Sequence, residues 1–166
     1  MIKIRSYLES DSETVGRLVA DTYGQYNLTF LPLEERALYL GPFQYANSPE
    51  KMHRDEIANV LRAPLVWVAE NEEGEIVGVL RGSKDRLHSL FVRGDHHRMG
   101  IGRLLVQTFE QECLQLGSQK ITLASSLYAI PFYLSLGYKK STGLRAGWSF
   151  EGRDLNWQPM KKILKK

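Results

Sequence analysis

The stretch LHSLFVRGDHHRMGIGRLL, residues 87–105, decides the fold of this chain. A short apolar run from Leu87 to Val92 is followed by a basic turn, and Gly100 and Gly102 then open an amphipathic segment. The pattern predicts a strand, a turn and a helix. Glycines at such a turn let an anion approach the backbone, where the N–H groups and dipole of the helix N-terminus favour negative charge. The segment is therefore a candidate phosphate-binding loop.

Other glycine motifs fit this loop less well. A dinucleotide-binding loop requires a third glycine three positions after Gly102, where the chain has Leu105. The Gly-Lys-Ser/Thr of a nucleoside-triphosphate loop is absent. For two glycines alone, a turn without a ligand is at least as good an interpretation, so the neighbouring residues have to decide.

A second informative segment begins at Ile121 and reads ITLASSLYAIPFYLSLGYKK. It predicts a strand, a polar connection, a short helix and a further strand, with Gly137 as a left-handed cap after the helix. The two segments stand about 30 residues apart, and two motifs in a fixed order are more specific than either one alone.

Both segments resemble motifs of the GCN5-related N-acetyltransferase (GNAT) superfamily. Motif A is matched on its strand and at the two glycines of its pyrophosphate loop, with His97 where the family usually has Gln or Arg. Motif B is matched from the short helix to the next strand, with Ser126 in place of the usual Asn. The matching residues are Leu90, Phe91, Val92, Gly100 and Gly102 in motif A, and Ala129, Phe132, Tyr133, Gly137 and Tyr138 in motif B.

The remaining elements follow in an order that agrees with this resemblance. Alternation predicts a strand at residues 2–7, and Ser10 to Glu13 predicts a capping box for a helix. Residues 33–40 have a weak helical pattern, and Pro49 predicts the first position of a helix that ends near Leu61. The remaining predicted strands are a hairpin around NEEG, at residues 65–70 and 75–82, one strand directly after Tyr138, and a last strand around residues 155–163.

The resemblance implies an α/β (α+β) fold in a single domain, residues 1–166. It implies a mixed central sheet of about seven strands, with the fourth and fifth splayed, and about four flanking helices. It also implies acetyl-CoA as acyl donor. The residues implied to bind acetyl-CoA are Leu90, Phe91, Val92, His97, Arg98, Met99, Gly100, Ile101, Gly102, Arg103, Ser126, Phe132 and Tyr133.

Acyl transfer to an amine requires a proton acceptor, an oxyanion donor and a proton for the thiolate. The resemblance implies the Leu90 N–H as donor to the thioester carbonyl and Tyr133 as general acid, although Tyr133 also fits a packing role. His88 is the candidate base, because LHSLFV resembles the strand of the arylalkylamine acetyltransferase branch. Two residues along a strand share a face, so His88 is expected to point the same way as Leu90. Alternatively, His88 only packs or hydrogen-bonds in the sheet, which is an equally good interpretation. A chain of water molecules could then serve as the base.

The expected reaction is acetylation of a primary amine, of a small molecule or a protein, by direct attack in a ternary complex. Its acceptor pocket is expected from the aromatic segment 24–47 and the loop around Trp148 and Phe150, although these aromatics also fit a core or a dimer surface. A catalytically silent acyl-CoA sensor or partner-binding module is the alternative, favoured by the departures at His97 and Ser126. Adjacent histidines at 96 and 97 lack ligand spacing, so no metal is expected.

Composition sets wider bounds. The chain has 166 residues, 43% hydrophobic, and a net charge of +3, which fits one compact domain and favours no nucleic-acid partner. Cys113 is the single cysteine and falls on an apolar helix face, which predicts a reduced core residue in a cytoplasmic protein. No signal peptide or membrane-length apolar run is present, so no membrane partner is expected. The resemblance leaves a homodimer open.

Overall fold

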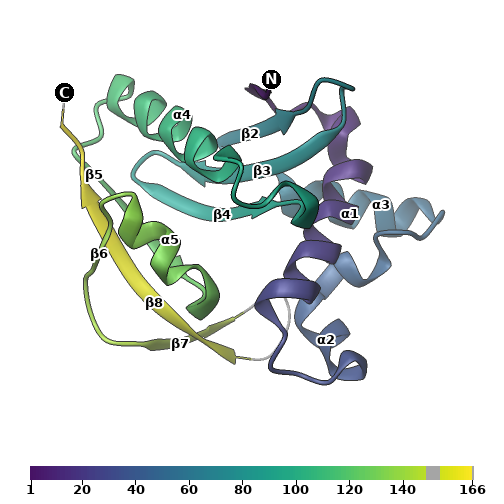
Figure 1. The fold of residues 1–166 in the computed structure, drawn as a ribbon. Helices are drawn as coiled ribbons and strands as arrows, with labels where there is room; N and C mark the ends of the chain where they lie inside the picture. The colour runs from purple at the N-terminus through teal and green to yellow at the C-terminus, as the bar shows by residue number, and fades with distance from the viewer. Residues whose placement is uncertain (149–153, 166) are drawn as a thin grey trace.

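The computed structural model describes residues 1–148 and 154–165 of the chain (Figure 1). Its strands form one mixed sheet in the order β1-β2-β3-β4-β5-β8-β6, with β7 paired to β8. The strands are β1 (Lys3–Ser6), β2 (Leu65–Glu70), β3 (Ile76–Ser83), β4 (Arg86–Val92), β5 (Lys120–Ser125), β6 (Lys139–Lys140), β7 (Arg145–Trp148) and β8 (Asp154–Ile163). The α-helices are α1 (Ser12–Thr22), α2 (Leu33–Leu40), α3 (Lys51–Leu61), α4 (Ile101–Gln115) and α5 (Ile130–Ser135).

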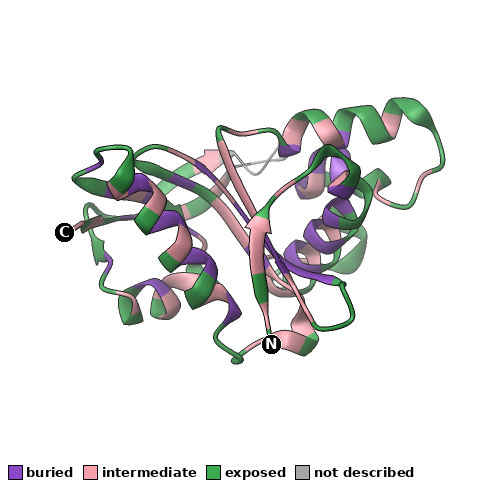
Figure 2. Cartoon of the chain, turned by 90° about the horizontal axis from the view of Figure 1, so that it is seen from above, coloured by how far each residue is buried: buried purple, intermediate pink, exposed green. Residues whose placement is uncertain are grey.

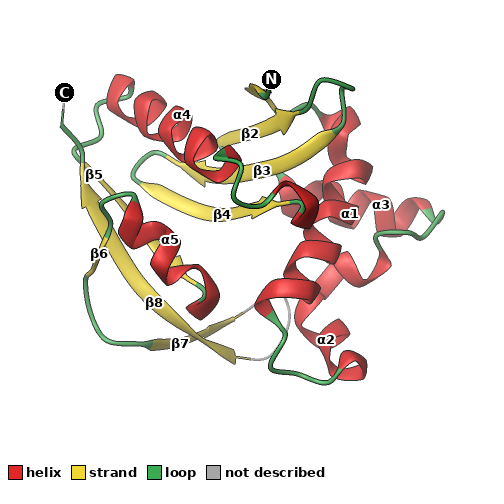
Figure 3. Ribbon diagram, in the orientation of Figure 1, coloured by secondary structure: helices red, strands yellow, loops and turns green. Residues whose placement is uncertain are grey.

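The mixed α/β architecture is confirmed, and so is the splay in the middle of the sheet. β4 and β5 run parallel and pair only at Arg86 and Thr122, after which they diverge (Figure 3). The other neighbours are antiparallel and pair along most of their length. The sheet therefore consists of two arms joined at one end.

Two hydrophobic clusters hold the helices onto the two faces of the sheet (Figure 2). One joins α4 and α5 to β5 and β8, with Phe109, Tyr138 and Met160 almost fully buried. The other joins α1 and α3 to β3, with Val15, Leu61 and Val79 at 0% exposure. Cys113 lies in the first cluster as a free, fully buried thiol, as its place on the apolar face predicts.

The start of α1 differs from the predicted capping box at Ser10 to Glu13. A 3-10 turn at Glu9–Asp11 precedes α1, and the Asp11 carboxylate accepts the Leu8 N–H at 2.8 Å. Arg5 donates two N–H groups to the same carboxylate, at 2.8 and 3.0 Å, and holds its pKa below the ordinary value. An aspartate fixed by an arginine of β1 therefore holds the turn before α1. Among the residues that the structure describes, the start of α1 itself has no side-chain cap hydrogen bond in place of the capping box expected.

Three smaller differences concern the extent of elements. α3 begins at Lys51, after Pro49, because the Ser48 hydroxyl accepts the Glu50 N–H at 3.2 Å. The weak pattern at residues 33–40 is a true helix, α2, which gives five α-helices where about four were expected. The segment after Tyr138 forms two short strands, β6 and β7, which gives eight strands where about seven were expected.

Gly137 has φ +93° after α5, as its predicted role in capping requires. In the described part of the chain, no helix is both long and apolar enough to cross a membrane.

Candidate active site

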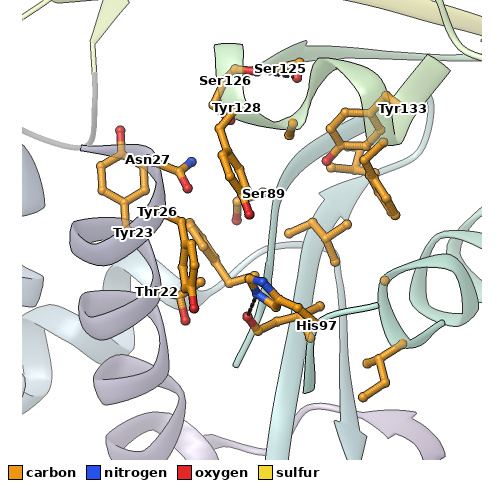
Figure 4. Close-up of a pocket in the computed structure, with 18 of the residues that line it drawn as sticks. Thr22, Tyr23, Tyr26, Asn27, Ser89, His97, Ser125, Ser126, Tyr128 and Tyr133 are labelled. Carbon is orange, nitrogen blue, oxygen red and sulfur yellow. Dashed lines mark hydrogen bonds between the residues drawn. The ribbon is translucent and has the colours of Figure 1, made fainter. Parts of the chain in front are cut away.

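A cavity of about 800 Å³ opens where β4 and β5 diverge (Figure 4). The N-terminus of α4 and the residues of β4 form one side. The end of β5, the turn Leu127–Ala129 and α5 form the other. The π-helical turn Tyr23–Asn27 also lines the cavity, with the ring of Tyr26 against His97 of the basic turn. The cavity thus gathers the two sequence motifs from opposite arms of the sheet.

The backbone of β4 presents polar groups to this cavity. Arg93 N–H donates to the Val77 carbonyl oxygen of β3 at 2.8 Å, and hydrogen-bonded pairs alternate along an antiparallel ladder. The N–H and C=O groups of Phe91 therefore face β3, whereas those of Leu90 and Val92 face the opening. This differs from the expectation that all three residues pair with a ligand: Phe91 contributes a side chain, 6% exposed, to the core.

The glycine loop has the backbone that an anion site needs. Gly100 adopts φ +81° and Arg98 φ +62°, so the chain turns sharply into α4. The first hydrogen bond of the helix runs from Leu104 N–H to the Gly100 carbonyl at 3.0 Å. Among the described residues, no backbone acceptor is therefore present for the N–H groups of Gly102 and Arg103. These groups point out of the first turn as donors.

The two glycines serve different physical needs. Gly100 has open space around its Cα but requires a positive φ. Gly102 has ordinary helical φ, but a Cβ there would lie 3.0 Å from Cζ of Phe132. Phe132 lines the cavity from α5, so Gly102 is the place where the two arms of the sheet approach each other through motifs A and B.

The side chains of the basic turn are placed differently from expectation. His97 was expected to donate to a phosphate, but its Nε2 donates to the Val92 carbonyl oxygen at 2.6 Å. His96 lies against Asp95, with 2.8 Å between Nδ1 and Oδ1. Arg98 and Arg103 line the cavity and supply its fixed positive charge at this end.

Of the other residues predicted to contact a cofactor, Ile101 and Ser126 line the same cavity, whereas Met99 does not. Ile101 is 1% exposed, so its side chain belongs to the core and only its backbone faces the loop. Met99 is 61% exposed, so its side chain extends away from the core. Ser126 begins the turn Leu127–Ala129, and its carbonyl accepts the Ala129 N–H at 3.1 Å.

Tyr133 lies in the cavity wall beneath the divergence of β4 and β5 (Figure 4). It is 5% exposed, and its ring meets Phe132 and Tyr138 edge to face, with centroids 5.1 and 5.7 Å away. Burial raises the pKa of the Tyr133 hydroxyl well above its ordinary value. The phenol is therefore neutral at physiological pH and available as a proton donor.

His88 occupies an irregular position in β4. Arg81 pairs with Ser89 and Gly82 pairs with Leu87, so His88 is the extra residue of a β-bulge. Its Nε2 lies 3.3 Å from the Ser83 hydroxyl. The strict alternation on which the expected shared face of His88 and Leu90 depends is therefore interrupted, although both residues line the cavity.

The pKa of His88 is lowered, first by burial and then by the positive charges of Arg81 and Arg86. The imidazole is accordingly neutral at pH 7 and able to accept a proton. His88 lines the cavity despite its irregular position.

The aromatic segment expected to form an acceptor pocket divides into three groups. Tyr26 lines the cavity, with its ring 4.6 Å from that of His97 and 5.8 Å from that of Tyr128. Tyr39 and Phe43 are core residues, whereas Phe30 is 68% exposed. Phe150 and the side chain of Trp148 lie outside the described part of the chain.

Several of the residues that line the cavity were not identified from the sequence. They come from β3, β4, the N-terminal helical region, the turn before α5, and β8: Arg81, Ser89, Thr22, Asn27, Tyr128 and Trp157. The one available signal was Arg81, the single charged residue in the stretch IVGVLRG, residues 76–82. Among the described residues, no group of three or more His, Cys, Asp or Glu is placed to hold a metal ion.

Comparison with known proteins gives a consistent result. A family model described as an acetyltransferase (GNAT) domain matches residues 41–164. Human N-acetyltransferase 8 is 34% identical over 93 residues, which span 48% of this chain and 40% of that protein.

Two solved structures share the fold. A GCN5-related N-acetyltransferase from Rhodopseudomonas palustris has a TM-score of 0.77 at 20% identity, covering 98% of this chain and 95% of that one. PaiA N-acetyltransferase from Thermoplasma acidophilum, in complex with coenzyme A, has a TM-score of 0.72 at 18% identity over 99% of each chain.

Proposed function

Since the chain belongs to the GNAT acetyltransferase family, we propose that it transfers an acetyl group from acetyl-CoA to a primary amine. The observation that carries the proposal is the cavity between β4 and β5. There the backbone groups of Leu90, the Val92 N–H and the first-turn N–H groups of α4 line the same cavity. The proposal treats residues 1–166 as one catalytic domain, because strands from both parts of the chain share the sheet.

The cosubstrate is proposed to lie along these groups. Its pyrophosphate meets the N–H groups of Gly102 and Arg103, where the helix dipole and the charges of Arg98 and Arg103 favour an anion. Its amide arm pairs with Leu90 and the Val92 N–H, because these face the opening in the way a neighbouring strand requires. The thioester then lies next to the buried phenol of Tyr133. His97 assists by holding the Val92 carbonyl and thereby the loop.

The reaction is proposed to proceed by direct attack. Neutral His88 takes a proton from the ammonium form of the acceptor, directly or through water, and the amine nitrogen bonds to the thioester carbon. The Leu90 N–H stabilises the oxyanion as a fixed dipole. The carbon–sulfur bond then breaks, and Tyr133 donates a proton to the leaving thiolate. The nitrogen loses its remaining extra proton as the amide forms, and this proton restores the Tyr133 phenol, directly or through water. Cys113, fully buried in the core, takes no part.

The test is amine-dependent thiol release from acetyl-CoA across a panel of small amines and peptides. The assay reads the CoA thiol cleanly, since the protein has a single cysteine and it is buried. We expect release above the rate of spontaneous hydrolysis for at least one amine. If the protein binds CoA but releases no thiol with any amine, it is an acyl-CoA sensor and the proposal is wrong.

A further inference from the structure

The charges around the cavity are one-sided. Among the described residues, no Asp or Glu lines it, whereas Arg81, Arg98 and Arg103 do. Arg98 and Arg103 stand at the glycine loop, where a pyrophosphate accounts for them. Arg81 lies on β3, away from the loop, and needs a different explanation.

Within the described part of the chain, Arg81 has only neutral hydrogen-bond partners. Its Nε donates to the Leu61 carbonyl at 3.0 Å and its Nη2 to the Val60 carbonyl at 2.6 Å, both at the end of α3. Its Nη1 donates to the Ser89 hydroxyl at 3.2 Å. A guanidinium has five N–H donors, so two remain after these three bonds.

Burial lowers the pKa of Arg81. The Tyr7 phenol opposes this effect only in part, and among the described residues no Asp or Glu opposes it. A partly buried charge without a counter-charge is costly, and a bound anion removes that cost. The structure therefore holds a fixed cation ready for an anionic group on the side of the cavity away from the glycine loop.

We propose, on the basis of the acetyl transfer proposed above, that the acceptor is a free α-amino acid whose carboxylate binds Arg81 and Ser89. These two residues are directly paired across β3 and β4. Ser89 stands between His88, the proposed base, and Leu90, the proposed oxyanion donor. In an α-amino acid a single carbon separates the amine from the carboxylate, so a carboxylate at Ser89 brings the amine next to both groups.

The remaining walls indicate the side chain of that amino acid. Tyr23 and Tyr26 approach from the N-terminal helical region and Tyr128 from the opposite arm, and all three line the same cavity as Ser89 (Figure 4). Trp157 of β8 also lines the cavity. Aromatic rings on several sides favour an aromatic or other large apolar substituent. A polyamine is disfavoured, because its charges would meet Arg81 and no carboxylate.

A purely structural role for Arg81 is the competing explanation, because two of its bonds close the end of α3. A series of acceptor amines, tested on the wild-type protein, distinguishes this structural role from carboxylate binding. L-Phenylalanine, phenethylamine, L-phenylalaninamide and spermidine are compared as acceptors with saturating acetyl-CoA. Phenethylamine lacks only the carboxylate, and the amide represents the N-terminus of a peptide.

We expect kcat/KM for L-phenylalanine to exceed that for phenethylamine and the amide by at least about tenfold, mostly through KM. Equal or better transfer to phenethylamine, the amide or spermidine would overturn the amino-acid assignment while the acetyltransferase function stands. Transfer to none of the four, with activity on another amine, would also overturn it. Absence of transfer to every amine would remove the function and this inference together.

Variants supply a second measurement. Ser89→Ala leaves both Arg81 bonds to α3 in place, and we expect it to lower the preference for L-phenylalanine over phenethylamine about fivefold. Arg81→Gln should abolish the preference. Arg62→Gln is the matched control, since Arg62 is an exposed arginine at the same end of α3, bonded to Glu9 and outside the cavity lining. An unchanged preference in both Ser89→Ala and Arg81→Gln would return Arg81 to a structural role.

Discussion

The two regions of the cavity, at the glycine loop and around Arg81, present different kinds of polar group. At the glycine loop, most of the polar groups are backbone N–H and C=O groups of Leu90, Val92 and the first turn of α4. Away from the loop they are the side chains of Arg81, Ser89 and His88. Backbone sites depend on local conformation and leave a motif in the sequence, whereas side-chain sites depend on which distant elements meet. The first group therefore carries the motif of the family, and no local motif marks the second.

The largest effect should come from closing the region at the glycine loop. In Gly102→Val, the new Cβ would lie 3.0 Å from Cζ of Phe132, and the two methyl groups add further bulk. The ring and the loop must therefore separate. Loss of two N–H bonds to pyrophosphate costs about 4 kcal/mol, so we expect acetyl-CoA affinity to fall roughly 1000-fold by calorimetry.

Gly143→Val is the control for this change, because the space around Gly143 is open and its φ is ordinary. It should bind acetyl-CoA as the wild type does. Unchanged affinity in Gly102→Val would refute the assignment of the phosphate loop.

The next effect tests the group beneath the thioester. Tyr133→Phe should lower kcat about 100-fold with little change in acetyl-CoA affinity, because only the proton donor is lost. The raised pKa predicts that the phenol stays protonated through neutral pH, so Tyr133 should cause no loss of rate as pH rises toward 9.

Tyr138→Phe supplies a close comparison. Tyr138 packs against Tyr133, and its buried hydroxyl has no hydrogen-bond partner among the described residues. Its removal should leave kcat within about twofold and cost no stability. If the two variants behave alike, Tyr133 is a packing residue.

The proposed role of His88 as base predicts a specific pH dependence of kcat/KM. Because the pKa of His88 is lowered, its neutral, active form persists to lower pH. We therefore expect kcat/KM to decrease with acidification only below about pH 6.5. His88→Gln should reduce kcat/KM about tenfold and abolish that decrease. His53→Gln, which removes a histidine stacked on Tyr45 at α3, should retain it. If the decrease of kcat/KM at acid pH persists in His88→Gln, water alone removes the proton from the acceptor amine.

The smallest effect on activity is expected outside both regions. Cys113→Ala removes a fully buried thiol from the core and should cost about 1 kcal/mol of unfolding free energy in a denaturant titration. Turnover should be unchanged. Complete loss of activity in a folded Cys113→Ala protein would refute direct attack.

The same division explains how far the sequence could be interpreted. The hairpin, the strand before the loop and the caps at Gly100 and Gly137 follow from local patterns, and the structure has them. The bulge at His88 does not, because it arises from the register between β3 and β4. Nor does the bond from His97 to Val92, which depends on how the loop folds back.

Arg81 shows the limit most clearly. In the sequence it is one charged residue in an apolar strand, and its meaning depends on α3 from earlier in the chain and Ser89 from the next strand. No local pattern contains those three elements at once.

The divergence of β4 and β5 has a consequence for the life of the protein in a cell. Two strands with unpaired edges inside a sheet can pair with a strand of another molecule as readily as an outer edge does. A ligand lying between them covers both edges. We therefore expect the protein without acetyl-CoA to self-associate more readily than the protein with acetyl-CoA bound, so that scarcity of the donor would lower the amount of usable catalyst as well as its rate.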